Sequence, residues 1–529
     1  MKDTIYFNGD ILTMEKNMYV EAIYIKDGII KKVGSKEEIL KLKNKETNII
    51  DLKGKTLMPS FIDSHSHFFG YANSKLQVNL EEAVNFNEIN EKIKSFIENN
   101  NIKQDTWILC NNFDYNSLEE KTYPRIEFLD KISPKNPLVI SNKSGHNGLF
   151  NSLAMKKLGI NESIKNPEGG VFHRENGKLN GYAEENAYIN YIQKVPMPSL
   201  ENIIKAIKKA QNSYASYGIT TVQEGMIVSS LVGFLTYIID LNILKVDYIG
   251  YVDIKEKDTI LSKLKDYIKK YKNHFKVGGY KAFLDGSPQG RTAYMRSDYV
   301  GESGYRAYPV INNNETKKLM KIALEDNMQV LVHCNGDAAV EMFIKQYKEA
   351  KKEINTKNDI RPVIVHAQLI GKDQLEEVKE LGMIPSFFEA HVYYFGDVHI
   401  KNFGYERASQ ISPAKAALEK GLKFTLHQDS PVIEPNIIET IWIAVNREMK
   451  NGEVLGDGEK IPVVEALKAV TINAAYQYME ENLKGSIKEG KLADLVILDN
   501  NPLKVQLKDI NKIKVVETIK EGNTIYKSK

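Results

Sequence analysis

The sequence predicts an α/β protein: a (β/α)8 barrel with a small β-sandwich domain built from both termini and a long insertion after the first barrel strand. Three observations support this fold class. The chain has 529 residues, more than one simple core usually contains. Its middle part alternates short apolar strands with helical patterns, which is typical of parallel sheets. Its two ends share a different pattern, of short strands and tight turns.

The two terminal segments have the same strand pattern. Near the N-terminus, short apolar strands are interrupted by Asn-Gly and Asp-Gly pairs, which are the strongest short-range hairpin signals. The segment that begins near Gly485 alternates strands and turns in the same way. We therefore expect residues 1–58 and 480–529 to form one composite β domain and residues 59–479 to form the barrel.

Eight segments of the middle part are predicted to be barrel strands. Each is short and largely apolar, and clear helical patterns separate several of them, such as the one that Gly382 ends. In a barrel of this type, functional side chains lie at the C-terminal ends of the strands. The predicted strands are residues 60–65, 219–224, 246–252, 279–284, 330–333, 363–366, 384–388 and 424–426.

The interval between the first and second predicted strands is too long for one crossover helix. Residues from about 70 to 217 contain apolar strands of their own and glycine-rich turns, whereas loops of this length without a separate fold are uncommon in compact domains. We expect this stretch to be an inserted region that covers the entrance to the barrel.

The composition excludes several classes of protein. With 42% hydrophobic and 27% charged residues, the chain has the balance of an ordinary globular protein. A net charge of +3 without a basic stripe argues against nucleic acid as a partner. We find no signal-peptide pattern and no membrane-length apolar run, so we expect a cytoplasmic location and no membrane partner. Cys110 and Cys334 are too few for a disulfide framework.

Histidines and one aspartate stand at the ends of the predicted strands. His65 and His67 lie two residues apart on one strand, so both side chains point into the barrel. His333, His366 and Asp429 each end a further apolar segment. A single histidine of this kind is more often a buried core residue. The whole set, however, consists of ligands that Zn-like cations prefer, so it indicates a metal site.

Lys281 lies inside an apolar strand, where a charged amine is costly to desolvate. If the amine is carbamylated, it becomes a carboxylate that can bridge two cations. The alternatives are a lysine that reaches the rim of the barrel and a lysine paired with Asp285. The strand context gives them about equal weight.

Six motifs together resemble those of one family. They are SFIDSHSHF, YKAFLDGSPQGRTAYM, VHCNGDAAV, IVHAQ, HQDSPV and GSIKEGKLADLVILD, and they occur in this order over nearly the whole chain. The chain thus resembles the amidohydrolase superfamily of metal-dependent hydrolases and, within it, amidohydrolase family 3, the YtcJ-like group. The resemblance implies roles for six residues: His65 and His67 bind the more buried metal, carbamylated Lys281 bridges, His333 and His366 bind the second metal, and Asp429 binds metal and moves the proton.

The resemblance implies hydrolysis of a C–N bond other than a peptide bond. One or two divalent cations, with Zn as the expected metal, would activate a water molecule, and Asp429 would transfer its proton to the leaving nitrogen. The expected substrates are small molecules: N-acyl or N-formyl amines, N-acyl amino acids or aminoheterocycles. An ester or phosphoester hydrolase with the same site and a non-catalytic binding protein are the alternatives. A homodimer is considered as the assembly.

Four further residues are candidates for contacts with the substrate. Asp285 and Arg291 lie on the loop after the lysine strand, where Arg291 either clamps a carboxylate or forms a loop salt bridge. The resemblance suggests that His146, in the inserted region, faces the substrate, although a histidine that caps loop backbone is the alternative. His427 shares a strand face with Asp429 and could orient the aspartate or the substrate.

Overall fold

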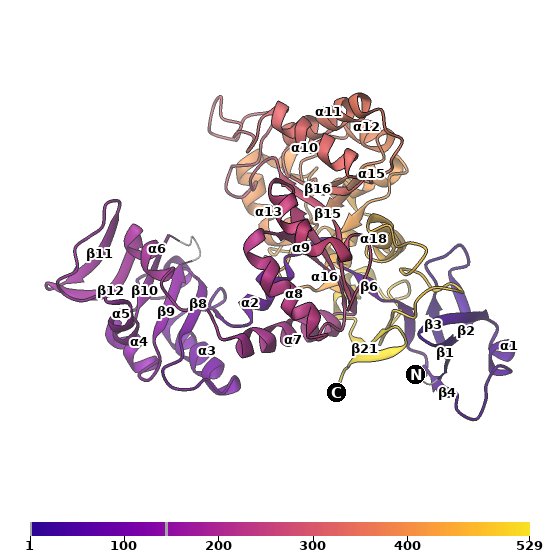
Figure 1. The fold of residues 1–529 in the computed structure, drawn as a ribbon, viewed down its shortest axis with the longest axis horizontal. Helices are drawn as coiled ribbons and strands as arrows, with labels where there is room; N and C mark the ends of the chain where they lie inside the picture. The colour runs from indigo at the N-terminus through magenta and orange to yellow at the C-terminus, as the bar shows by residue number, and fades with distance from the viewer. Residues whose placement is uncertain (1–2, 143–145) are drawn as a thin grey trace. The chain divides into compact units, whose positions relative to one another are not determined.

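The computed structural model describes residues 3–142 and 146–529, and the chain divides into two compact units (Figure 1). One unit comprises Met1–Phe69 and Ala210–Lys529. The other comprises Gly70–Lys209, which is most of the predicted insertion. The second boundary lies inside helix α7 (Leu200–Ser216), whereas the sequence led us to expect it near residue 217.

The first unit contains an eight-stranded parallel sheet. Its strands run in the order β19-β18-β17-β16-β15-β14-β13-β6, and every neighbouring pair is parallel. All eight predicted barrel strands therefore occur, in one sheet and in chain order. Their bounds are β6 (Phe61–Ile62), β13 (Ile219–Ile227), β14 (Asp247–Asp253), β15 (Phe275–Phe283), β16 (Gln329–Cys334), β17 (Val363–His366), β18 (Ile384–Phe387) and β19 (Thr425–Leu426).

Hydrogen bonds connect the two edges of this sheet just beyond their strands. The backbone N–H of Asp429 donates to the carbonyl oxygen of His65 at 3.2 Å, and the N–H of His67 donates to the carbonyl oxygen of Ser430 at 2.8 Å. The sheet is therefore curled, and the segment after β6 lies against the segment after β19. This contact brings the first and last predicted ligands of the chain together.

Helices connect the strands of the curled sheet, as βα units require. In α11 (Asp337–Ile354), the buried residues Ala339, Phe343 and Tyr347 are four apart, so they form one apolar face. The helices α10 (Asn313–Glu325) and α11 lie side by side next to β16 (Figure 1). The others in this unit are α1 (Lys36–Leu40), α2 (Phe68–Ser74, which crosses into the second unit), α8 (Val232–Asp240), α9 (Lys257–Leu264), α12 (Leu375–Glu380), α13 (Ala390–Phe403), α14 (Tyr405–Ala408), α15 (Ala414–Glu419), α16 (Ile437–Asn446), α17 (Val463–Ala469) and α18 (Ile472–Gln477). Within the described ranges, no helix has the length and apolar character needed to cross a membrane.

Strands from both termini pair in a second eight-stranded sheet of the same unit. Its order is β22-β21-β20-β5-β1-β2-β3, with β4 paired to β1, so indigo and yellow strands share one sheet in Figure 1. The join is the antiparallel pair of β5 and β20. The sandwich arrangement and the domain limits at residues 58 and 480 stay predictions. The strands are β1 (Thr4–Leu12), β2 (Tyr19–Lys26), β3 (Ile29–Gly34), β4 (Asn48–Asp51), β5 (Thr56–Pro59), β20 (Leu495–Leu498), β21 (Val515–Lys520) and β22 (Asn523–Lys527).

The two dipeptides that predicted tight turns near the N-terminus adopt different structures. Asp27-Gly28 joins β2 to β3 with positive φ at both residues, 52° and 74°, which is the tight hairpin turn that such a pair favours. Asn8-Gly9 instead lies within β1, where the pairing register shifts. A Cβ on Gly9 would lie 2.3 Å from the carbonyl oxygen of Lys55. The second hairpin prediction is therefore wrong, because this glycine allows close backbone packing inside one strand.

The inserted unit has a sheet and a core of its own. Its six strands run in the order β11-β12-β10-β9-β8-β7. The apolar stretches that suggested separate strands form β8 and β9, and the glycine-rich stretch forms the β11–β12 hairpin. Its expected place over the barrel entrance stays a prediction. The elements are β7 (Val78–Asn79), α3 (Phe86–Asn99), β8 (Ile108–Phe113), α4 (Ile126–Ile132), β9 (Leu138–Asn142), β10 (Asn147–Phe150), α5 (Ser152–Leu158), β11 (Gly170–Glu175), β12 (Lys178–Glu185) and α6 (Asn186–Ile192).

Candidate metal centre

The C-terminal ends of the curled sheet bring the predicted metal ligands together. His65 and His67 follow β6, His366 ends β17 and Asp429 follows β19. Lys281 and His333 lie near the ends of β15 and β16. Of these, His65, His67 and Asp429 offer three ligand atoms that all lie within 4.8 Å of one another. The predicted ligands therefore converge in space, although His65 and His67 lie in the segment after β6 and not on one strand as expected, because β6 ends at Ile62.

Asp429 lies among the histidines of this cluster. Its Oδ1 is 3.6 Å from Nε2 of His65 and 3.6 Å from Nε2 of His67. Its Oδ2 is 3.9 Å from Nε2 of His366. The ring of His333 lies next to that of His366, with 4.7 Å between their centroids. One carboxylate thus faces three imidazoles, and the fourth is adjacent.

Lys281 approaches the same cluster from β15. Its Nζ lies 3.3 Å from Nε2 of His65, and the residue is fully buried, so it does not reach the rim. Burial lowers the pKa of Lys281 to about 8, which increases the fraction of neutral amine, the form that reacts with carbon dioxide to give a carbamate. Asp285 is engaged elsewhere, since its carboxylate accepts from the backbone N–H groups of Tyr294, Asn335 and Gly336.

Two neighbours on β13 hold the first pair of histidines. Nδ1 of His65 lies 2.6 Å from Oε1 of Gln223. The Gln223 amide nitrogen donates to the carbonyl oxygen of Ser64 at 2.8 Å, so the amide oxygen faces the imidazole and accepts its proton. Oε1 of Glu224 lies 3.5 Å from Nδ1 of His67. In both rings Nδ1 is the nitrogen that meets this outer partner, and Nε2 is the nitrogen that faces Asp429 and the candidate metal site.

Our reasoning from the sequence missed Gln223 and Glu224. Both are buried within the strand sequence ITTVQEGMI. Two adjacent polar residues inside an otherwise apolar strand are unusual, because buried polar groups need partners. That pattern could have marked them, although the sequence alone does not identify the histidines as their partners.

Two of the ligand histidines are held in the neutral state that a metal ligand needs, and a third is not. Burial and nearby positive charges lower the pKa of His65 and His366 well below the ordinary histidine value, so both rings are neutral, as ligands must be. For His67, burial opposes protonation, but Glu224 and Asp429 outweigh it and raise the pKa. A metal would have to displace that proton. Burial raises the pKa of Asp429.

Two buried atoms of the cluster have no hydrogen-bond partner: Oδ1 of Asp429 and Nδ1 of His333. A buried polar atom without a partner costs about 1–3 kcal/mol. A divalent cation would supply the missing interaction, and imidazole with carboxylate is a suitable donor set for Zn and similar ions. The residues present therefore fit a bound metal.

Gly225 packs directly against both ligand histidines. A Cβ at this position would lie 2.7 Å from Cε1 of His65 and 3.0 Å from Cε1 of His67. We expect Gly225→Ala to displace these rings and to weaken metal binding by about 10–100-fold, as measured by competition with a chelator. Gly233→Ala is the matched control, because a Cβ there meets nothing within 4 Å. Equal metal affinity in the two variants would contradict this expectation.

The loop after β15 uses its charged residues to hold its own structure. Besides its three backbone contacts, Asp285 lies 3.3 Å from Nδ1 of His333. Nε of Arg291 donates to Oδ1 of Asn402 at 2.9 Å, and its guanidinium pairs with Glu302. The geometry of Arg291 matches the loop salt bridge that was the alternative to a substrate clamp. A contact of Asp285 or Arg291 with substrate stays a prediction.

The other two substrate candidates lie in different surroundings. His146 belongs to the inserted unit, where it is exposed and its Nδ1 lies 3.0 Å from Oε2 of Glu185. Its contact with substrate stays a prediction, and the preceding residues 143–145 lie outside the described ranges. His427 is fully buried, and its Nε2 lies 3.1 Å from Nδ1 of His366. His427 therefore contacts a predicted metal ligand rather than open space.

A second group of ligand-like atoms lies at the opposite ends of the strands. Asp247, His274 and Glu521 have ligand atoms within 4.8 Å of one another. However, Lys484 and Lys520 both pair with Asp247, and Lys520 also pairs with Glu521. These two ammonium groups neutralise the carboxylates and would repel a cation. We interpret this group as a buried ionic cluster and not as a metal centre.

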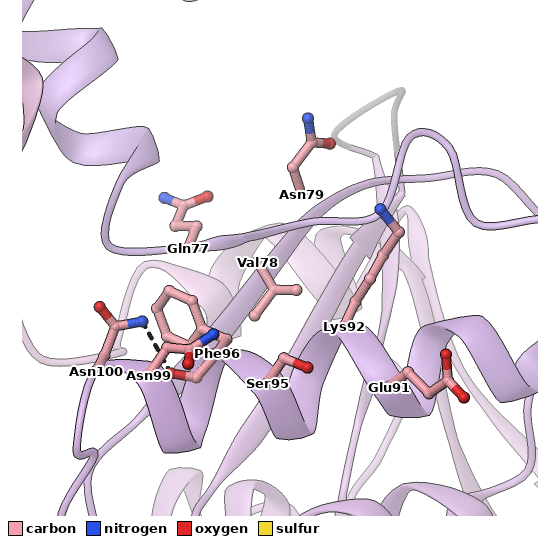
Figure 2. Close-up of a pocket in the computed structure, with 9 residues that line it drawn as sticks. All are labelled: Gln77, Val78, Asn79, Glu91, Lys92, Ser95, Phe96, Asn99 and Asn100. Carbon is pink, nitrogen blue, oxygen red and sulfur yellow. Dashed lines mark hydrogen bonds between the residues drawn. The ribbon is translucent and has the colours of Figure 1, made fainter. Parts of the chain in front are cut away.

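Cavity volume does not identify the functional site. A cavity of about 490 Å³ lies in the inserted unit, beside α3 and the edge strand β7 (Figure 2). Figure 2 shows Glu91 and Lys92 projecting from α3 in different directions. No histidine is among its lining residues. The site is therefore indicated by the chemistry of the histidine cluster and not by the size of a cavity.

Comparisons with known proteins agree with this geometry. Residues 48–526 match the model of a family described as the amidohydrolase family. The chain is 24% identical to the YtcJ protein of Bacillus subtilis, over 99% of both chains. It is 24% identical to the N-substituted formamide deformylase of Arthrobacter pascens, over 99% of this chain and 98% of that one. The crystal structure of an uncharacterized metal-dependent hydrolase from Pyrococcus furiosus has a TM-score of 0.77 and 25% identity, over 95% of this chain and 100% of that one. Because the family model matches most of its length, this chain belongs to the amidohydrolase family of hydrolases.

Proposed function

We propose that this protein is a metal-dependent amidohydrolase that cleaves a C–N bond other than a peptide bond. The observation that carries this proposal is the convergence of four histidines and Lys281 around Asp429. Among the described residues, Oδ1 of Asp429 and Nδ1 of His333 are buried without a hydrogen-bond partner, so a bound cation would complete their interactions. The family membership supports the hydrolytic reaction.

The residues divide into the ligands of two metal positions. One ion is proposed to be held by His65, His67 and Asp429. The ligand atoms of these three residues lie within 4.8 Å of one another. His333 and His366 are proposed to hold a second ion, and this division of the ligands follows the resemblance in sequence. Zn is the proposed metal, and Lys281 is proposed to bridge the two positions as a carbamate.

A bound divalent ion of this kind supplies a hydroxide nucleophile at neutral pH and polarises a carbonyl oxygen. The chain itself supplies the proton transfer. Asp429 accepts the proton of the attacking water and then donates it to the leaving nitrogen, as a general base followed by a general acid.

N-substituted formamides are the first substrate class to test. The Arthrobacter pascens relative, which aligns with 99% of this chain, is named for deformylation of such compounds. Addition of water to the formyl carbon breaks the C–N bond and gives formate and an amine. Other N-acyl amines, N-acyl amino acids and aminoheterocycles are the next classes, and the cytoplasmic location and the homodimer stay predictions.

The decisive experiment is the metal content per chain of protein purified without added metal, measured for the wild type and for Lys281→Ala. We expect one or two equivalents of Zn-like metal in the wild type and a sharp decrease in the variant. Lys276→Ala is the matched control, since Lys276 is also a buried lysine of β15 but pairs with Glu480. Its metal content should equal that of the wild type.

Two results would contradict the proposal. If wild-type protein holds no metal even after reconstitution, the histidine cluster is structural and the binding-protein alternative gains support. If the metal is present but a panel of amides, esters and phosphoesters shows turnover of esters or phosphoesters alone, the C–N specificity is wrong.

A further inference from the structure

A buried chain of hydrogen bonds lies behind His366. We propose that His427 is a positioning residue, which fixes the orientation of His366 through a hydrogen-bond chain that continues to Ser386 and Ser64 and ends at a backbone carbonyl. This inference rests on the proposed function, because it assumes that His366 binds a metal. It assigns a role to His427 that differs from both a contact with substrate and a contact with Asp429.

Four distances define the chain. Nδ1 of His366 lies 3.1 Å from Nε2 of His427, and Nδ1 of His427 lies 3.0 Å from Oγ of Ser386. Oγ of Ser386 lies 3.4 Å from Oγ of Ser64, whose hydroxyl donates to the carbonyl oxygen of Leu426 at 3.0 Å. All four side chains are buried, so water does not compete for these contacts.

The final carbonyl sets the direction of every bond in the chain. A carbonyl oxygen can only accept, so the Ser64 hydroxyl uses its one proton there and accepts from Ser386. The Ser386 hydroxyl then accepts from Nδ1 of His427, whose Nε2 carries no proton and accepts from Nδ1 of His366. The chain therefore places the proton of His366 on Nδ1.

The consequence for His366 is a free lone pair on Nε2. This nitrogen lies 3.9 Å from Oδ2 of Asp429, so it faces the proposed metal site. A neutral imidazole binds a metal through its unprotonated nitrogen, and the bond made by the other nitrogen selects the tautomer. The hydrogen-bond chain thus fixes, in the metal-free protein, the tautomer of His366 that can bind a metal.

Packing holds the His427 ring in the plane that this chain needs. The ring stacks on Phe388, with 5.4 Å between centroids and 19° between planes. Its face also meets the ring of His65 edge-on, with centroids 5.3 Å apart and planes at 87°. Rotation of His427 away from His366 would break both contacts.

His427 completes a set of outer partners for the ligand histidines. Gln223 accepts from His65 with an amide oxygen, and Glu224 lies against His67 with a carboxylate. An outer partner of this kind typically contributes 10–100-fold to metal affinity. For His366, the outer nitrogen meets another imidazole, that of His427, and not an amide or a carboxylate of the described residues. The serine chain is therefore needed to define which nitrogen of His427 accepts.

The test is the affinity of the full-length protein for Zn²⁺, measured by chelator competition, together with the absorption spectrum of the Co²⁺-substituted protein. We expect His427→Phe to weaken binding of one ion by about 10–100-fold and to change the Co²⁺ spectrum. His427→Gln should recover most of the affinity, because a glutamine oxygen at that distance can accept from Nδ1 of His366.

His399→Phe is the matched control. His399 is also fully buried, also stacks on a phenylalanine, Phe403, and contacts Gln368 instead of a proposed ligand. Its Zn²⁺ affinity and Co²⁺ spectrum should equal those of the wild type. If His427→Phe does not fold, Ser386→Ala removes one hydroxyl from the same chain and should still weaken binding several-fold.

The outcomes separate this inference from the proposed function. Wild-type affinity and an unchanged spectrum in His427→Phe, or in Ser386→Ala when that variant replaces it, would overturn the positioning role. A His427→Gln variant as weak as His427→Phe would also overturn it. A wild-type protein that binds no Zn²⁺ at all would instead overturn the proposed function.

Discussion

Replacement of Asp429 by asparagine is expected to lower kcat by about 10²–10⁴-fold, the usual contribution of a general acid–base group, while the protein keeps its metal. An amide at this position cannot accept the proton of the attacking water. The amide oxygen still occupies the place of Oδ1, which lies 3.6 Å from Nε2 of both His65 and His67. The two histidines and Lys281 should therefore retain the ion.

The measurement is kcat and metal per chain on the same preparation of Asp429→Asn, with the substrate that the panel identifies. Asp373→Asn is the control for the chemical change, because Asp373 is an exposed carboxylate that pairs with Arg296. It should behave as the wild type. Full turnover in Asp429→Asn would rule out the assigned proton transfer, and loss of the metal would show that Asp429 is needed mainly as a ligand.

Much of the fold could be predicted because barrel strands have a strong local signal. Clear helical patterns separate several of the short apolar segments, and all eight predicted segments form strands of one parallel sheet. The convergence of His333, His366 and Asp429 follows from the same reasoning, since the C-terminal ends of parallel strands lie at one edge of a sheet. Residues far apart in the sequence could therefore be grouped before any distance was known.

The partners of those residues could not be predicted in the same way. Gln223 contacts His65, and His427 contacts His366, but a contact across strands depends on register and on side-chain orientation. The residue pattern of a single strand carries no information on the register or on the side-chain orientation. For Arg291 the sequence left both a substrate clamp and a loop salt bridge open, because loop residues find partners such as Glu302 through a backbone path that has no periodic signal.

The buried ionic cluster is a feature that the sequence analysis did not detect. Lys520, at the end of β21, lies 2.9 Å from Asp247 at the start of β14 and 3.0 Å from Asp494 just before β20. All three side chains are at most 5% exposed. The cluster therefore links the sheet of the termini to the N-terminal end of the curled sheet. Charged residues near turns in a sequence are usually solvated, so nothing in the local pattern marked them as buried.

Lys520→Met is expected to lower the free energy of unfolding at pH 7 by about 3–5 kcal/mol, because it leaves buried carboxylates without one of their cations. Burial raises the pKa of Asp247, but Lys484 and Lys520 outweigh it and hold that pKa well below the usual value. A carboxyl with a lowered folded pKa stabilises the protein above its unfolded pKa, and this contribution is lost as the pH falls through the folded value. The difference between wild type and variant should therefore be complete at pH 7 and shrink below about pH 4.

Urea unfolding of the two proteins across this pH range measures that difference directly. Lys504→Met is the control, since Lys504 makes an exposed ion pair with Asp10 at 2.7 Å, and exposed pairs contribute little to stability. A decrease in Lys520→Met no larger than in Lys504→Met would mean that the apolar replacement compensates for the lost charge. The two sheets would then be held together by contacts other than the ionic cluster.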